Sequence, residues 1–189
     1  GQRRVGTGAL LAMLVHPNFR SRLGSLGVVI GDSLDALTLR AGGLDTAAYH
    51  LSKAEWNRLR ERSLLAKSYY DSARVVLAAR AQARPDDPAV HAELGMALAG
   101  LGLHDQAIAE ARLAVRLYPL SKDALGGISL ETNLAYVYTL VGESDSAIAA
   151  LDRLRRLPTA VTEAEIRLGA RWAPLRANPK FQSLLTPVN

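Results

Sequence analysis

The sequence predicts an all-α fold built from pairs of short helices. Of its 189 residues, 49% are apolar and only 5% are aromatic, and Ala and Leu dominate the apolar set. Close-packed helices use such residues, whereas strands favour β-branched and aromatic side chains. The length suits one domain with a substantial core or a run of about five helical hairpins. We therefore expect one cooperative, all-helical unit.

The clearest helix pair is predicted at 88–121. Leu94, Leu98 and Leu101 occur at i, i+4 and i+7, which is the spacing of one helix face. Gly102 interrupts this pattern, and a second apolar face follows it. The residues of that second face are Ala107, Ile108, Ala111, Ala114 and Val115. Two amphipathic helices joined at a glycine are the simplest structure with this pattern.

Residues 1–44 precede the regular pattern and are interpreted as a divergent N-terminal helical cap. Their apolar run at 9–15 ends at His16-Pro17, and residues 32–40 are predicted to form another helix. A terminal repeat is atypical because one of its sides must face water. The segment Gly6-Thr7-Gly8 lacks the third glycine and the preceding strand that a nucleotide-binding loop requires.

A further helix pair is predicted at 45–85. Asp45 is suited to cap a helix that runs to about Arg60, and a second helix begins at Ser63 and ends before Pro85.

One long helix over 53–84 remains an alternative for this region. No glycine separates Arg60 from Ser63, and Ser52 with Glu55 forms a capping-box pattern. The sequence leaves both alternatives open.

The third pair is predicted at about 128–161. Its Gly142 matches Gly102 at a distance of forty residues, and we assign the extra residues to a loop at 122–127. Pro158 closes the unit. The apolar positions that repeat the earlier spacing are Leu134, Ala135, Tyr138, Ala147, Ile148, Leu151 and Leu154.

The C-terminal residues 162–189 are predicted to cover the last pair. Thr162 and Glu165 form a capping box that begins a further helix. The apolar residues expected to fold back are Trp172, Leu175, Phe181 and Leu184. Residues 45–189 would then form one domain.

The central pair resembles a tetratricopeptide (TPR) repeat, a helix-turn-helix unit of about 34 residues. The resemblance rests on Leu94-Gly95, on Ala107 with Ala114, and on the closing Pro119. Gly95 is expected to let the second helix approach closely. The family implies a TPR-like α-solenoid of antiparallel helix pairs, wound as a right-handed superhelix with a concave binding groove.

Three further segments resemble the C-terminal TPR region of bacterial multidomain signalling proteins, where it often follows a serine/threonine kinase module. They are 70–74, 121–124 and the tail 171–185. This resemblance implies a non-catalytic scaffold that belongs to a larger bacterial signalling or regulatory protein.

The TPR resemblance also implies which residues line the concave groove. In TPR proteins the first helices of successive repeats face it, which gives Ala92, Glu93, Met96, Ala99, Thr132, Asn133, Tyr136 and Thr139. A carboxylate clamp would need Lys and Asn at several of these positions, and only Asn133 fits. We expect an apolar helix or an extended peptide, with Met96 adaptable and Tyr136 able to pack and hydrogen-bond. Contacts between adjacent helices are the alternative role for these two side chains.

Other functional classes have weaker support in the sequence. The net charge of +5 comes almost entirely from arginine, but Ala92, Met96 and Ala99 offer little for reading bases, so nucleic acid is disfavoured as a partner. The histidines are scattered, there are no cysteines, and no acid–base pair, nucleophile set or phosphate loop is present. We expect neither an enzyme nor a bound cofactor or metal.

Two expectations concern assembly and membranes. Head-to-tail stacking of helix pairs into a dimer or filament is the alternative to partner binding. Apolar runs such as 8–15 are far shorter than the roughly 18 residues that span a bilayer, so we expect no transmembrane segment in this chain.

Overall fold

The computed structural model describes residues 45–157 and 161–185, and every regular element within these ranges is a helix. The predicted all-α class is confirmed for these residues, while the expected cap at 1–44 lies outside them. The elements are α3 (Thr46–Leu59), α4 (Ser63–Ala83), α5 (Pro88–Leu101), α6 (His104–Leu117), α7 (Ala124–Val141), α8 (Ser144–Leu154), α9 (Glu163–Leu168), the 3-10 helix η2 (Ala170–Leu175) and α10 (Pro179–Leu184).

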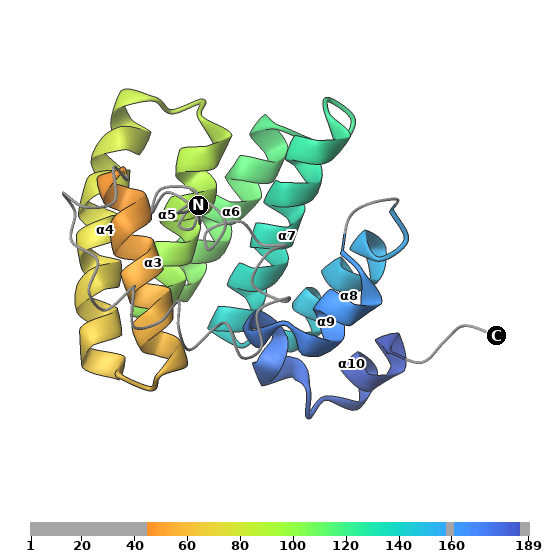
Figure 1. Ribbon diagram of the computed structural model, residues 1–189. Coiled ribbons are helices and arrows are strands. Elements are labelled where there is room, and N and C mark those ends of the chain that lie inside the picture. The colour runs from red at the N-terminus through yellow and green to blue at the C-terminus, as the bar shows by residue number, and fades with distance from the viewer. Residues whose placement is uncertain (1–44, 158–160, 186–189) are drawn as a thin grey trace, which may run out of the picture.

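The longer helices pack as neighbouring pairs, α3 with α4, α5 with α6, and α7 with α8. Each pair also packs on the next, through α4 against α5 and α6 against α7. Figure 1 shows this order running across the molecule from α3 and α4 to α8, with α10 beside α8. An amphipathic helix must bury its apolar stripe on a neighbour, and a row of pairs gives every helix such a neighbour.

Each of the three pairs turns at a residue with a left-handed backbone. Gly102 follows α5 with φ of 82°, and Gly142 occupies the same place after α7 with φ of 85°. Glu61 lies between α3 and α4 with φ of 58°. Glycine adopts these angles without steric cost, whereas a residue with a Cβ is strained. The predicted glycine turns are confirmed, and the first pair makes its turn without a glycine.

Residues 45–84 therefore form two helices, and the alternative of one long helix is wrong. The backbone N–H of Arg62 donates to the carbonyl oxygen of Asn57 at 2.9 Å and closes the turn after α3. Ser52 and Glu55 lie inside α3 and are only 4% and 8% exposed. Their capping-box spacing is thus incidental, because neither residue is at a helix start.

The predicted helix starts have the expected caps. The Asp45 carboxylate accepts from the N–H of Ala47 at 2.8 Å, and the Asp87 carboxylate accepts from that of Ala89 at 3.1 Å. Thr162 and Glu165 form the reciprocal capping box that begins α9. Such caps satisfy N–H groups that the first helical turn leaves unpaired.

Gly95 lies where α5 and α6 approach closely. A Cβ at this position would lie 3.0 Å from the carbonyl oxygen of Ala107 and 3.2 Å from the Cβ of Ala111. The expected close approach at Gly95 is confirmed. Gly100, one turn later, has a different neighbour, since a Cβ there would lie 2.3 Å from the Tyr70 ring of α4.

The prediction of a loop over the whole of 122–127 is wrong, because α7 already begins at Ala124. The Asp123 carboxylate accepts from the N–H of Gly126 at 2.9 Å, inside the first turn. Gly126 and Gly127 lie inside the helix and do not break it, because each is where another part of the chain packs closely against the backbone. A Cβ on Gly126 would lie 2.7 Å from the Tyr118 ring, and one on Gly127 would lie 2.7 Å from the Cα of Leu120. The predicted closing residue Pro158 lies outside the described residues.

The four apolar residues of the C-terminal segment that were predicted to fold back are buried. Trp172 is 2% exposed, Leu175 1%, Phe181 0% and Leu184 8%, and all four belong to the main core. Contacts of η2 with α7 and of α10 with α8 place this segment on the last pair. In the two described ranges, no helix has the length and hydrophobicity needed to cross a membrane.

The left-handed turns predict opposite effects of two kinds of substitution. Glu61→Gly should raise the free energy of unfolding by about 0.5–1 kcal/mol, because it removes the Cβ strain at positive φ. Gly102→Ala and Gly142→Ala should each lower it by about 1 kcal/mol for the same reason. Urea unfolding followed by circular dichroism measures all three. A destabilised Glu61→Gly variant would contradict this account of the first turn.

Candidate functional site

The residues predicted to line a groove are divided between α5 and α7, and most of them are buried. The exposed fractions are 2% for Ala92, 5% for Ala99, 4% for Thr132, 2% for Tyr136 and 4% for Thr139. Glu93, Met96 and Asn133 are half-buried. Only these last three offer appreciable surface to another molecule in this structure.

The buried alanines and threonines have contacts within the helices. Ala92 packs with Ala114 of α6 and Leu130 of α7. The hydroxyl of Thr132 donates to the carbonyl oxygen of Ile128 at 2.8 Å. The hydroxyl of Thr139 donates in the same way to Ala135, at 3.0 Å. A threonine inside a helix satisfies its hydroxyl by such a bond to the preceding turn.

Tyr136 belongs to a buried polar group, which we call the Glu55 cluster and which consists of Glu55, Arg58, Tyr70 and Tyr136. The hydroxyls of Tyr70 and Tyr136 donate to the two carboxylate oxygens of Glu55. Arg58 donates to Glu55 Oε2 at 3.2 Å and to the Tyr136 hydroxyl at 2.8 Å. These bonds connect α3 with α4 and with α7, the first helix of the third pair.

The electrostatics of the Glu55 cluster keep both phenols protonated. Burial, followed by the nearby negative charge of Glu55, raises the pKa of Tyr70 and of Tyr136 above the ordinary value. Burial acts to lower the pKa of Arg58, but the charge and hydrogen bond of Glu55 together with the two nearby phenols outweigh it and raise that pKa overall. The phenols are thus fixed as donors and the carboxylate as their acceptor. A raised phenol pKa is the opposite of what a tyrosine acting as a general base requires.

Aromatic and cationic side chains of η2 cover the same tyrosine. The Trp172 ring meets the Tyr136 ring edge to face, with centroids 6.1 Å apart. The Arg171 guanidinium carbon lies 5.0 Å from the Tyr136 ring centroid. Both geometries are favourable for aromatic pairing and for cation–π attraction. The C-terminal segment therefore holds α7 at the point where α7 meets Glu55.

The Glu55 cluster could not be recognised in the sequence. Glu55 and Tyr136 are 81 positions apart, and no local pattern relates an acid in one helix to a tyrosine in the third pair. The one signal in the sequence is an acid on the apolar side of α3, and the spacing of Glu55 from Ser52 also fits a capping box.

His91 is a second buried polar group, placed between α5, α6 and the turn before α5. One ring nitrogen, Nδ1, lies 2.6 Å from Glu110 Oε2, and Nε2 lies 2.7 Å from the carbonyl oxygen of Pro85. Both neighbours are acceptors, so the doubly protonated ring satisfies both. Burial acts to lower the pKa of His91, but the Glu110 carboxylate and the Pro85 carbonyl outweigh it and raise that pKa.

Glu93 is a half-buried acid of α5 that faces other charges. Burial and the negative charge of Asp45 raise the pKa of Glu93 to about 7, while Arg80 acts in the opposite direction. Asp45 itself is paired with Arg80 at 2.7 Å. Because burial is the largest of these effects and Asp45 adds to it, Glu93 takes up its proton near neutral pH.

The comparisons with known proteins add no assignment. Family models, curated protein sequences and solved structures were compared with this chain, and none matches it. Among the described residues, no group of His, Cys, Asp and Glu is arranged to hold a metal ion.

The Glu55 cluster predicts that two tyrosines of α7 differ in importance. Tyr136→Phe should lower the free energy of unfolding by about 1.5–3 kcal/mol, because it removes a donor to a buried charge. Tyr138→Phe is the matched control two residues away. Among the described residues its hydroxyl bonds only with Arg112, from which it accepts at 2.9 Å, so the loss should be about 1 kcal/mol or less. If urea unfolding shows that Tyr136→Phe and Tyr138→Phe lose the same free energy of unfolding, the role of Glu55 is contradicted.

The pKa shifts predict that stability falls as the pH rises. Glu93 and His91 both have raised pKa values in the folded state, so each contributes stability at low pH that is lost as the pH passes through the folded value. In Glu93→Gln, the free energy of unfolding should no longer fall between about pH 4.5 and 7. In His91→Gln, the fall in the free energy of unfolding above about pH 6.5 should be absent. Urea unfolding from pH 4.5 to 9 measures these slopes, and unchanged slopes in the variants would contradict both assignments.

Proposed function

We propose that the chain is a non-catalytic binding module for a protein or peptide, built from TPR-like helix pairs. The observation that carries the proposal is the run of three neighbouring pairs, each with a left-handed residue between its helices. Gly95 at the close contact of α5 with α6 adds support, since the TPR pattern has a Leu-Gly pair there. Helical repeats of this kind usually present surfaces for partners.

The proposed contact surface uses the residues of α5 and α7 that remain accessible, Glu93, Met96 and Asn133. Met96 is the apolar member, and its flexible thioether side chain adapts to different partners. Glu93 and Asn133 supply an acid and an amide that orient a bound segment. We propose that the occupant is an apolar helix or an extended peptide with one apolar anchor side chain. The buried Tyr136 contributes by packing below this surface.

Three wider features of the proposal rest on the sequence resemblance. They are the winding of the pairs as a right-handed solenoid, the membership of the TPR family, and the origin of the chain in a larger bacterial signalling protein. The packed pairs of the described residues are compatible with the first of these.

Self-assembly is a second candidate function, and the outer face of α4 favours it. Leu64 is 88% exposed, Leu65 45% and Val75 55%. Leu64 and Val75 are about three turns apart on one side of α4. Exposed large apolar side chains are common where protein chains contact one another. A second copy of the chain would cover them.

Two substitutions separate the two functions. Peptides selected from a random display library on the immobilised protein should bind Met96→Glu at least tenfold more weakly, because a charge is placed at the apolar anchor. Val75→Glu adds the same charge on α4 and should leave peptide affinity unchanged. Fluorescence polarisation of the synthesised peptides measures both affinities, after circular dichroism has shown that the variants fold.

Light scattering over a range of concentrations tests the second function. Self-assembly through α4 would give a mass that rises with concentration in the natural sequence and not in Val75→Glu. If no peptide distinguishes Met96→Glu and the mass depends on Val75, the binding proposal is wrong and self-assembly is the function.

A further inference from the structure

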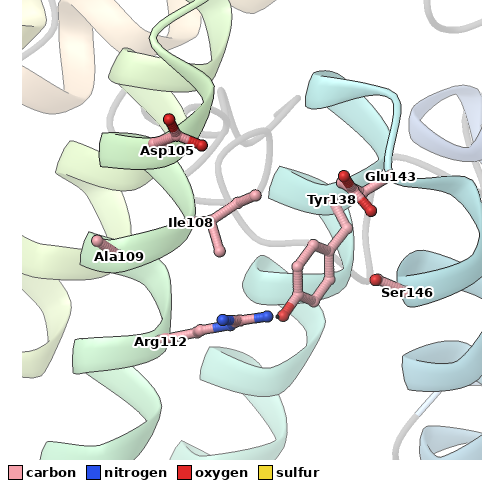
Figure 2. A pocket seen from close by; sticks show the side chains of 7 residues that line it. All are labelled: Asp105, Ile108, Ala109, Arg112, Tyr138, Glu143 and Ser146. Atoms are coloured by element: carbon pink, nitrogen blue, oxygen red, sulfur yellow. Dashed lines mark hydrogen bonds between the residues drawn. The ribbon is translucent and has the colours of Figure 1, made fainter.

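A surface hollow of about 320 Å³ lies between α6, α7 and the start of α8. Figure 2 shows its two walls. One stripe of α6 forms the first wall, with Asp105, Ala109 and Arg112 at i, i+4 and i+7. The small Ala109 side chain leaves the space between the two charged ones. Tyr138, together with Glu143 and Ser146, forms the opposite wall.

Arg112 marks one end of the hollow as a place for an anionic group. Its Nε donates to the Tyr138 hydroxyl at 2.9 Å, and its guanidinium carbon lies 5.7 Å from the Tyr138 ring centroid. The tyrosine is 7% exposed and belongs to the core, so it holds the guanidinium in place. Among the described residues, the two terminal nitrogens of Arg112 have no ion-pair partner. They are therefore available to bind a carboxylate in the bidentate way that arginine favours.

Asp105 and Glu143 mark the other end as a place for a cation. Both are exposed acids at the starts of helices, Asp105 in the first turn of α6 and Glu143 just before α8. The positive ends of the helix dipoles favour acids in these positions. Within the described parts of the chain, neither carboxylate is paired with a cation. Figure 2 shows both on the same side of the hollow, away from the Arg112 guanidinium.

The two ends do not neutralise each other, because among the described residues no ion pair joins Arg112 to either acid. Seven residues of α helix separate Asp105 from Arg112, which corresponds to roughly 10 Å along the axis. The Ile108 side chain lies between the ends and is partly buried against the core. The hollow thus presents a cation site at one end and an anion site at the other, with an apolar surface between them.

We propose that this hollow binds the C-terminal arginine of a partner polypeptide. One such residue carries both charges that the hollow complements. Its guanidinium pairs with Asp105 and Glu143, its methylene stem packs on Ile108, and its terminal carboxylate pairs with Arg112. An arginine fork presents several N–H donors at once, so it can bond to two carboxylates together, whereas a lysine ammonium is a single point of charge. The volume is near the lower limit of ligand pockets, about 300 Å³, and so suits one residue.

The site is separate from the surface on which the proposed function rests. Its side chains come from α6, α8 and the end of α7, while that function was assigned to Glu93, Met96 and Asn133. Either proposal can fail while the other stands, because their tests use different probes and different variants.

The test is a titration of the ¹⁵N-labelled full chain with N-acetyl-arginine at low salt, followed by NMR. We expect amide shift changes confined to 105–112 and 138–146, with a millimolar Kd. N-acetyl-citrulline has the same shape and carboxylate but no side-chain charge, and should bind at least tenfold more weakly. N-acetyl-arginine amide lacks the carboxylate and should also bind more weakly than N-acetyl-arginine.

Three variants test which side chains of the hollow bind the guanidinium and which bind the carboxylate of the probe. Asp105→Asn with Glu143→Gln should weaken N-acetyl-arginine at least tenfold, while Asp86→Asn, which removes an exposed carboxylate in the turn before α5, should not change it. Arg112→Gln should weaken N-acetyl-arginine but leave the amide unchanged. Equal affinities for the arginine and citrulline probes would overturn the proposal, as would shift changes spread over the whole chain. Tighter binding of free arginine than of N-acetyl-arginine would overturn the assignment to a polypeptide end.

Discussion

The carboxylate of Glu55, buried among helices of different pairs, constrains the rest of the structure. Removing a charged carboxylate from water costs several kcal/mol unless it is well hydrogen-bonded. Here two phenols and Arg58 supply those bonds, and they come from α3, α4 and α7. The first and third helix pairs are thereby joined directly, in addition to the contacts between neighbouring pairs. A simple solenoid, in which each repeat touches only its neighbours, would have no such link.

This link determines which residues are left to meet a partner. Tyr136 was expected to face a groove, but its hydroxyl is used by Glu55 and its ring is covered by Trp172 and Arg171. Of the residues predicted to line a groove, only Glu93, Met96 and Asn133 consequently remain accessible. On the other side of α7, Tyr138 holds Arg112 at the hollow. Two tyrosines two residues apart on one helix thus support different surfaces.

Local features of the fold could be predicted because short-range physics produces them. Asp45 and Asp87 cap helices, Gly102 and Gly142 adopt left-handed turns, and Gly95 allows a close helix contact. The failures have an equally physical cause. The loop at 122–127 was predicted because Gly142 follows Gly102 by forty residues and not 34, but α7 takes up the extra residues by beginning at Ala124. Gly126 and Gly127 lie inside that helix because Tyr118 and Leu120 occupy the space that a side chain would need. Glu61 turns the chain without the glycine that the pattern requires.

By itself the sequence determined the all-helical class, most helix boundaries, the turns at glycine and the apolar residues of the C-terminal segment, because each depends on spacing within a few turns of chain. Only the tertiary structure decided which polar side chains meet. Glu55 with Tyr136, and Arg112 with Tyr138, come from helices far apart in sequence. Their partners are chosen by the packing of whole helix pairs, and one-dimensional periodicity contains no information about that choice. For the same reason the sequence could place residues on a helix face but could not say whether that face remained open.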